Sequence, residues 1–355
     1  MRFCIEDQLP EQTQEETIIF CDGAGSQRYR TGVDLELSHW HPNRTAKRFA
    51  ADSSTEICMK FAASGESPDG YALVVNNHVD VDGILSVFVV LEPELSLRHR
   101  DTLVQAAEMG DFWGWGERSA QVLFQALVQG IARQIESGAN ADAIYQHGFD
   151  IVRAVLGGSE PADVGPGLSG LAACVKRIRS GEITRTLQHE RFVHYALPRA
   201  KSESDLRTAL RLLPFNTPLS DRIALLPHAR ALFDRERIVL QSVESEQGWY
   251  YDLCYPGYSW ADTASLWRPP GVVRQETHET DDLQWPPLDE AVAALAADEK
   301  GDGSWTCAKE FSPFQALEGR GFPVVLAFMD GGQPAASRTP PEIVAQRLAP
   351  AFKGS

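Results

Sequence analysis

An apolar segment that runs directly into a cluster of acidic residues is the feature that most constrains the fold of this chain. Residues 71–75 (YALVV) form a compact apolar run typical of a buried strand, and residues 84–91 (ILSVFVVL) are apolar enough for a helix packed on a sheet. Between them lies the sequence HVDVDG, residues 78–83. Polar side chains at the end of a buried strand predict a site at the carboxyl edge of a parallel sheet.

Flanking segments extend this pattern into an α/β unit. Residues 17–23 (TIIFCDG) favour a short strand, and Ser53 with Glu56 three positions later forms a capping-box pattern that predicts the start of a helix. Residues 118–136 and 141–156 have helical periodicity. The order strand, helix, strand, helix predicts an α/β fold with a parallel sheet in the N-terminal lobe.

The pattern changes after a loop rich in glycine and proline at residues 157–167. We therefore expect residues 1–160 to form the α/β lobe that carries HVDVDG, and residues 161–355 to form an α+β lobe that closes a cleft over it. In this second lobe we predict helices at 168–180 and 288–298, strands at 190–197 and 323–329, and a hairpin from 238–243 and 249–254.

Charge and composition limit the classes of partner. The chain has 33 basic and 49 acidic residues and a net charge of −16, which argues against a duplex nucleic-acid partner. The longest apolar stretch is too short to cross a bilayer and no signal peptide precedes it, so we predict a cytoplasmic protein with no membrane partner. The six cysteines form no CxxC pair, which argues against structural zinc.

The spacing within HVDVDG predicts a divalent-metal site. In an extended strand end, side chains at i, i+2 and i+4 project to the same side, which would bring His78, Asp80 and Asp82 together. Two adjacent carboxylates repel each other unless a cation lies between them. Carboxylates with an imidazole suit Mn²⁺ or Mg²⁺ best, with Fe²⁺ and Zn²⁺ as alternatives. Gly83 would then turn the chain into a helix whose free N–H groups face a substrate phosphate.

Residues upstream of the motif are candidates for completing this site. Asp22 ends the first predicted strand, which would lie beside the motif strand in a parallel sheet, and His39 and His41 share the i, i+2 spacing. We treat Asp22 and His41 as further metal ligands. The candidate substrate-binding residues are His39, Arg44, Asn77 and Ser53.

Two other interpretations of HVDVDG remain open. It contains the D-x-D-G of an EF-hand loop, although Val89 would then stand where a bidentate glutamate is needed. Alternatively, Asp80 and Asp82 only cap a helix and close a turn, and His78 is a core histidine.

Residues 74–86 (VVNNHVDVDGILS) resemble the first motif of the DHH phosphoesterase superfamily, whose members bind Mn²⁺ or Mg²⁺ ions that activate a water to attack phosphorus. The resemblance implies that His78, Asp80 and Asp82 are metal ligands. It also implies that Asp111, at the end of LVQAAEMGD (residues 103–111), bridges ions. No Asp-His-His triplet occurs in the chain, so a second ion would need other ligands. The chain is also similar to an uncharacterised bacterial family that carries the same element.

These observations predict a metal-dependent hydrolase of a small phosphoester or nucleotide-like substrate. The candidate catalytic residues are His78, Asp80, Asp82 and Asp111. The alternatives are a non-catalytic metal- or ligand-binding module and a structural or interaction protein.

Overall fold

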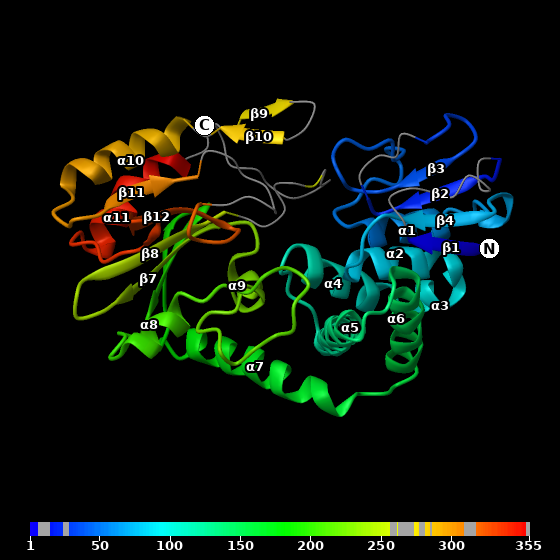
Figure 1. Cartoon of the computed structure of the whole chain (residues 1–355), viewed down its shortest axis with the longest axis horizontal. Helices are drawn as coiled ribbons and strands as arrows, with labels where there is room; N and C mark the ends of the chain where they lie inside the picture. The colour runs from blue at the N-terminus through cyan, green and yellow to red at the C-terminus, as the bar shows by residue number, and fades with distance from the viewer. Residues whose placement is uncertain are drawn as a thin grey trace. The chain divides into compact units, whose positions relative to one another are not determined.

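The computed structural model divides the chain into two compact units (Figure 1). It describes residues 1–5, 15–23, 28–255, 261, 273–276, 281–284, 286–308 and 317–352. The first unit comprises Met1–Leu168, Phe215–Leu219 and Ala261–Leu266. The second comprises Ser169–Pro214, Ser220–Trp260 and Trp267–Ser355. The sequence prediction placed a single boundary after residue 160, whereas the first unit also takes two short segments from later in the chain.

A four-stranded parallel sheet forms the centre of the first unit, with the strand order β1-β4-β2-β3. Its strands are β1 (Arg2–Ile5), β2 (Ile18–Cys21), β3 (Leu35–Leu37) and β4 (Leu73–Asn76). The motif strand β4 pairs in parallel with β2, with Ile19 opposite Val74. The predicted α/β class is therefore confirmed, as is the expected pairing of the first predicted strand with the motif strand.

Alternate side chains of β2 and β4 pack together on one face of the sheet. Ile18, Phe20, Leu73 and Val75 form one buried cluster.

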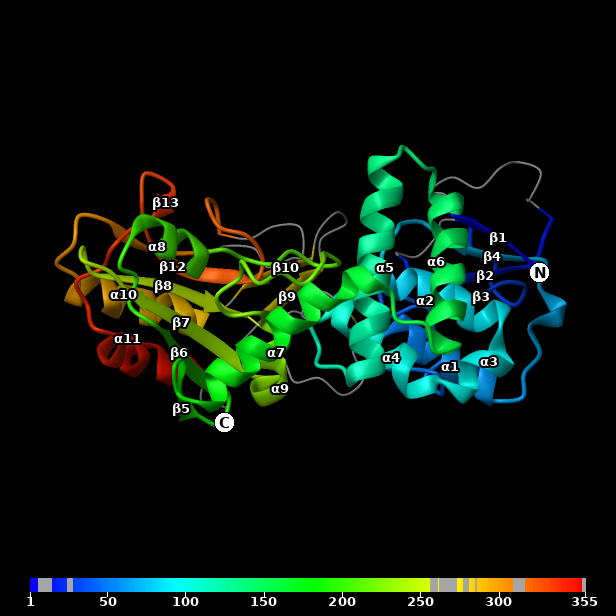
Figure 2. The same ribbon diagram turned by 90° about the horizontal axis from the view of Figure 1, so that it is seen from below.

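The helices of the first unit are α1 (Ser54–Ala63), α2 (Val81–Leu91), α3 (Pro93–Arg98), α4 (Arg100–Asp111), α5 (Arg118–Glu136) and α6 (Ala141–Leu156). Helices α1, α2 and α6 contact the strands, and α4 and α5 pack against α2 (Figure 2). Helices α5 and α6 have the bounds that periodicity predicted.

The second unit is built on a mixed sheet with the order β11-β12-β8-β7-β6-β5, to which β13 adds beside β12. Its strands are β5 (Thr184–His189), β6 (Phe192–Leu197), β7 (Ile238–Glu244), β8 (Trp249–Cys254), β11 (Ser304–Cys307), β12 (Val324–Asp330) and β13 (Gln333–Pro334). A separate pair consists of β9 (Val273–Glu276) and β10 (Asp281–Gln284). The helices are α7 (Gly165–Arg179), α8 (Glu203–Ala209), α9 (Pro227–Asp234), α10 (Pro286–Asp298) and α11 (Pro341–Leu348).

This unit agrees with the α+β prediction. Strands β7 and β8 form the predicted antiparallel hairpin. Strand β6 pairs in parallel with β7, and the remaining pairs of the sheet are antiparallel. No helix in the described part of the chain is both long enough and apolar enough to cross a membrane.

A candidate metal centre

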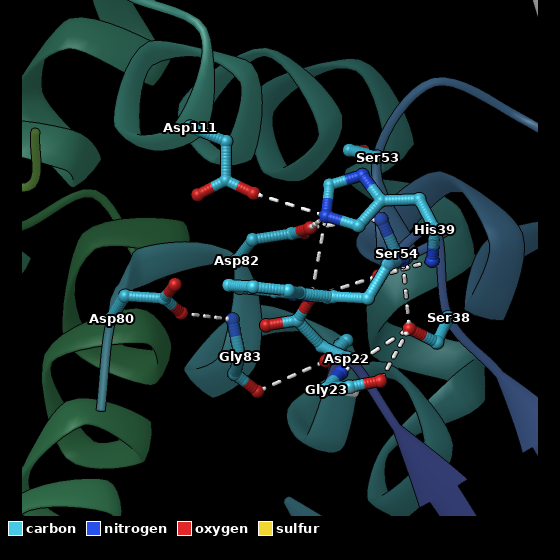
Figure 3. Close-up of polar contacts among 12 residues, drawn as sticks. Asp22, Gly23, Ser38, His39, Ser53, Ser54, Asp80, Asp82, Gly83 and Asp111 are labelled. Atoms are coloured by element: carbon cyan, nitrogen blue, oxygen red, sulfur yellow. Dashed lines mark hydrogen bonds and ion pairs between the residues drawn. The ribbon is translucent and has the colours of Figure 1, made fainter. Parts of the chain in front are cut away.

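Three neighbouring parallel strands, β4, β2 and β3, deliver acidic and imidazole side chains to one edge of the first sheet. Figure 3 shows Asp22, Asp82 and Asp111 around the ring of His39. Asp22 directly follows β2, His39 lies two residues beyond β3, and the loop after β4 supplies His78 and Asp80. Since the carboxyl ends of parallel strands meet at one edge, residues far apart in sequence converge there.

The first set of these side chains is fully enclosed. We call Asp22, His39, Asp82 and Asp111 the inner group. Each offers one ligand atom, and these atoms lie within 4.8 Å of one another. The Nε2 atom of His39 lies 3.4 Å from Asp22 Oδ1, 3.6 Å from Asp82 Oδ2 and 3.3 Å from Asp111 Oδ2. Asp82 is in the first turn of α2 and Asp111 is the last residue of α4. A buried group of this kind can hold a metal ion.

A second set of side chains shares Asp22 with the first. We call Asp22, His78 and Asp80 the outer group. The Nε2 atom of His78 lies 2.9 Å from Asp80 Oδ2 and 3.2 Å from Asp22 Oδ2. The His78 side chain is 29% exposed, whereas Asp22 is completely buried. The outer group is therefore the part of the site that solvent reaches.

Both histidines are oriented by a hydrogen bond at Nδ1. The Nδ1 of His39 lies 2.6 Å from the carbonyl oxygen of Asp52, and the Nδ1 of His78 lies 2.8 Å from Asn77 Oδ1. Because both partners are acceptors, each Nδ1 carries the hydrogen. Each Nε2 then faces the carboxylates, which is the arrangement seen around ligating histidines.

Asp80 and Asp82 are held by different helices. Asp80 Oδ1 accepts the N–H of Gly83 at 2.7 Å and caps α2. Asp82 accepts the N–H groups of Ser54 and Thr55, both at 2.8 Å, at the start of α1. The capping interpretation is therefore correct for Asp80, whereas Asp82 lies within α2 and binds the first N–H groups of α1, whose own N-cap is Ser53. Both residues nevertheless belong to the groups described above, because Oδ2 of each also faces a histidine.

The strand geometry expected for the motif is wrong. Strand β4 ends at Asn76 and α2 begins at Val81, so Asp82 is helical rather than the third member of an extended edge. The N–H of Gly83 donates to Asp80, and the N–H groups at the start of α1 donate to Asp82. These groups are therefore not available to bind a phosphate, contrary to the prediction. The strand–loop–helix context also excludes the EF-hand interpretation.

Gly83 is required by close packing rather than by a turn. A Cβ atom there would lie 2.3 Å from Asn76 Nδ2 and 2.5 Å from the hydroxyl of Tyr145. That hydroxyl donates to the carbonyl of His78 at 2.9 Å and accepts from Asn76 at 2.7 Å. The glycine thus allows Tyr145 to fix the loop that carries the outer group.

Mutual proximity shifts the pKa values of these groups strongly. Burial, together with the charge of Asp22, raises the pKa of Asp82 to about 6. Burial also raises the pKa of Asp111 well above its usual value. Although burial disfavours the imidazolium form, the carboxylates of Asp80 and Asp22 raise the pKa of His78 to about 12. Protons held in this way are what a cation would replace.

Two carboxylate oxygens of the centre lack full hydrogen bonding. Asp22 Oδ2 and Asp111 Oδ2 are buried and accept no hydrogen bond in the described structure; their contacts are the ion pairs with His78 and His39. Buried carboxylate oxygens are normally satisfied, so these two fit the donor set of a hard divalent cation.

The other candidate residues have different surroundings. His39, expected to bind substrate, belongs to the inner group, while His41, expected to bind metal, belongs to neither described group. Arg44 pairs with Glu36 at 3.1 Å. The hydroxyl of Ser53 accepts the N–H of Glu56 and caps α1 as the capping box predicted. The side-chain oxygen of Asn77 accepts the Nδ1–H of His78 at 2.8 Å.

Sequence reasoning missed the groups that hold the ligands in place. The carbonyl of Asp52 and the hydroxyl of Tyr145 have no sequence signature, because neither lies near its partner in the chain. The role of the Ser54 and Thr55 amides as donors could have been predicted, because the capping box marks a helix start, where the first N–H groups have no partner within the helix.

A family model described as a family of unknown function, DUF6687, matches residues 9–276. The chain belongs to the DUF6687 family. The part that matches the DUF6687 model contains all the residues of the inner and outer groups. Searches of curated proteins and of solved structures gave no match.

Proposed function

We propose that this DUF6687 protein is a metal-dependent hydrolase that cleaves a small phosphoester or nucleotide-like substrate. The observation that carries the proposal is the pair of ligand groups sharing Asp22. Two adjacent cation sites with a common carboxylate are the arrangement that lets ions act on both the attacking and the leaving oxygen of a phosphoryl group. The resemblance of HVDVDG to the DHH phosphoesterase motif supports the same reaction class.

The donor set favours Mn²⁺ or Mg²⁺. The inner group would hold one ion through three carboxylates and His39, and the outer group a second through Asp22, Asp80 and His78. Carboxylate oxygens dominate both groups, and oxygen ligands suit hard cations. One imidazole in each group makes Mn²⁺ the better match of the two.

The bound ions would supply a water of lowered pKa and offset the charge of the phosphoryl oxygens. The protein's own residues would hold the ions and the substrate in position. Asp22 would bridge, the Nδ1 contacts of His39 and His78 would fix the ligand nitrogens, and the partly exposed outer group would meet the substrate. A small substrate suits an acidic protein with a net charge of −16 better than a long polyanion does.

The test combines metal content with turnover. Metal-stripped protein should bind Mn²⁺ and then hydrolyse p-nitrophenyl phosphate, bis(p-nitrophenyl) phosphate or mononucleotides. Asp111→Asn should lower turnover by about 100-fold or more because it removes an inner ligand. Asp101→Asn is the matched control, since Asp101 is an exposed residue of the same helix, α4.

The outcomes separate the functional classes. Stoichiometric Mn²⁺ without turnover on any of these esters would indicate a metal-binding module rather than a hydrolase. Failure to bind Mn²⁺ or Mg²⁺ would reject the metal centre and leave Asp80 and Asp82 with a structural role only, as acceptors for N–H groups at the starts of α2 and α1.

A further inference from the structure

Five residues from the later part of the sequence belong to the first unit. The returning segment, Phe215–Leu219, lies in that unit although the chain on both sides of it belongs to the second. The ring of Phe215 stacks on that of Trp113, with centroids 3.9 Å apart and planes 15° from parallel. At the other end, the N–H of Leu219 donates to Gln125 Oε1 at 2.9 Å. The returning segment is therefore attached at both ends to residues beyond α4 and on α5.

Between these attachments, Asn216 reaches the start of the helix that carries the motif. Its Oδ1 accepts the N–H of Val81 at 3.1 Å. Val81 is the first residue of α2 and stands between Asp80 and Asp82. The first N–H groups of a helix have no partner within the helix, and here Asp80 satisfies one of them and Asn216 another. Asn216 has a φ of 51°, a left-handed conformation that asparagine adopts more readily than most residues.

The same side chain also lies against the end of α4. A Cβ atom on Gly110 would be 2.7 Å from Asn216 Oδ1 and 3.0 Å from Val81 Cβ. Gly110 therefore allows α4 to approach both groups closely, and the next residue is the inner ligand Asp111. Asn216 thus lies where the helix with Asp82 meets the helix with Asp111.

We infer that Asn216 is a positioning residue of the metal centre, supplied to it by the returning segment. This inference rests on the proposed metal centre. Asn216 is a member of neither ligand group. It acts on the ligands by fixing the first turn of α2, which carries Asp82 and follows Asp80, against the end of α4 that carries Asp111. The ligand geometry therefore depends on residues outside the first 168.

The test is Asn216→Gly in the full chain, with Mn²⁺ affinity measured by calorimetry and the bound ion examined by electron paramagnetic resonance. Glycine adopts a positive φ without strain, so the change removes the acceptor and leaves the backbone conformation accessible. We expect Mn²⁺ affinity to fall about 10-fold, as for other groups that hold ligands in place, and the Mn²⁺ spectrum to change. Asn216→Asp keeps an acceptor at the same position and should restore both.

Ser67→Gly is the matched control. Ser67 Oγ accepts the N–H of Asp69 at 3.1 Å in the turn before β4, so it makes the same kind of side-chain contact in the first unit, at residues that belong to neither ligand group. This variant should lose thermal stability while keeping wild-type Mn²⁺ affinity and spectrum. If Asn216→Gly does not fold, Phe215→Leu, which removes the ring stack but remains apolar, replaces it and should show a smaller loss of affinity.

The results distinguish this inference from the proposed function. Wild-type Mn²⁺ affinity in Asn216→Gly would overturn the role of Asn216 and leave the metal centre intact. An equal loss of affinity in Ser67→Gly would also overturn it, because the effect would then follow stability alone. Absence of Mn²⁺ binding in the wild-type protein would reject the metal centre itself, and the positioning role with it.

Discussion

The two histidines of the centre show how much of a ligand's behaviour is set by atoms that would not touch the metal. In each ring Nδ1–H is engaged by an oxygen, from Asp52 or Asn77, and Nε2 is left facing carboxylates. These contacts keep the hydrogen on Nδ1, so Nε2 is the nitrogen that gives up its proton and becomes the ligand when an ion binds. Loss of either acceptor would free the ring to rotate or to exchange tautomers.

Metal binding should release protons, which is a prediction at this scale. Although burial disfavours the charged form, the neighbouring carboxylates raise the pKa of His78 to about 12 and also raise that of His39, so the site holds protons on its imidazoles at neutral pH when no cation is bound. A ligating Nε2 must be unprotonated, so apparent affinity should rise about 10-fold per pH unit for each proton displaced, between about pH 6 and pH 8. Calorimetry of Mn²⁺ binding in buffers of different ionisation enthalpy counts these protons.

His78→Gln provides the comparison, because it removes the titrating group of the outer set only. It should reduce the number of protons released, while release from the inner group continues. A Mn²⁺ affinity that is the same at both ends of this pH range would contradict the protonation states inferred from the structure.

Single residues were predictable from sequence only where type and spacing were both informative. Asp22, His78, Asp80 and Asp82 follow strands or begin a helix, and both signals are visible in the chain. His39 and His41 are equivalent in spacing, and the sequence does not distinguish them. His39 belongs to the inner group because the carbonyl of Asp52 orients its ring, a tertiary contact across 13 residues.

Among the elements, α1 and α2 are tied together by one carboxylate. Asp82 belongs to α2 but satisfies two N–H groups at the start of α1, where the helix dipole also favours a negative charge. Asp80, in contrast, caps only its own helix. Asp80 and Asp82 are only two residues apart, yet they have different structural roles and belong to different candidate ligand groups.

This difference predicts that two isosteric variants, which should both weaken metal binding, differ in how much they lower the free energy of unfolding. Asp80→Asn should lower the free energy of unfolding less, because asparagine caps helices as well as aspartate does and only the ion pair with the partly exposed His78 is lost, yet it should weaken the outer ion. Asp82→Asn should lower the free energy of unfolding by about 1–3 kcal/mol, because its NH₂ group would oppose a backbone N–H, and should also weaken the inner ion. Urea denaturation without metal measures the first quantity, and Mn²⁺ titration the second. Equal destabilisation by the two variants would contradict the assigned contacts.

Element type was predictable wherever a segment was long or strongly periodic. Helices α5 and α6 and the hairpin of β7 and β8 were correct for this reason. Strands β1 and β3 were missed because each contains a charged residue and lacks the continuous apolar run that marked the equally short β2 and β4. The error at Asp82 has a different cause, since the alternation of HVDVD mimics a strand while Asp80 in fact initiates a helix.

For the molecule as a whole, the proposed metal centre belongs to the first unit alone, because all its candidate ligands come from that unit. A ligand that binds only the folded state stabilises it by mass action. At a Mn²⁺ concentration about 100 times the dissociation constant, the first unit should gain about 2.7 kcal/mol, or roughly 5–10 °C in Tm. Differential scanning calorimetry should show this shift in the transition of the first unit and none in that of the second. Asp111→Asn, which lacks an inner ligand, should show no comparable shift.

The discontinuity of the first unit also bears on how the protein can be dissected genetically. A gene fragment that stops at residue 168 encodes an incomplete unit, because it leaves out the ring that stacks on Trp113 and the acceptor for Val81. Such a fragment would be expected to bind metal poorly although it contains all the candidate ligands. A deletion experiment would then wrongly place the ligands in the second half of the chain. A circularly permuted gene whose new ends fall at an exposed turn, such as the one at Gly138, would keep the returning segment joined to both of its neighbours.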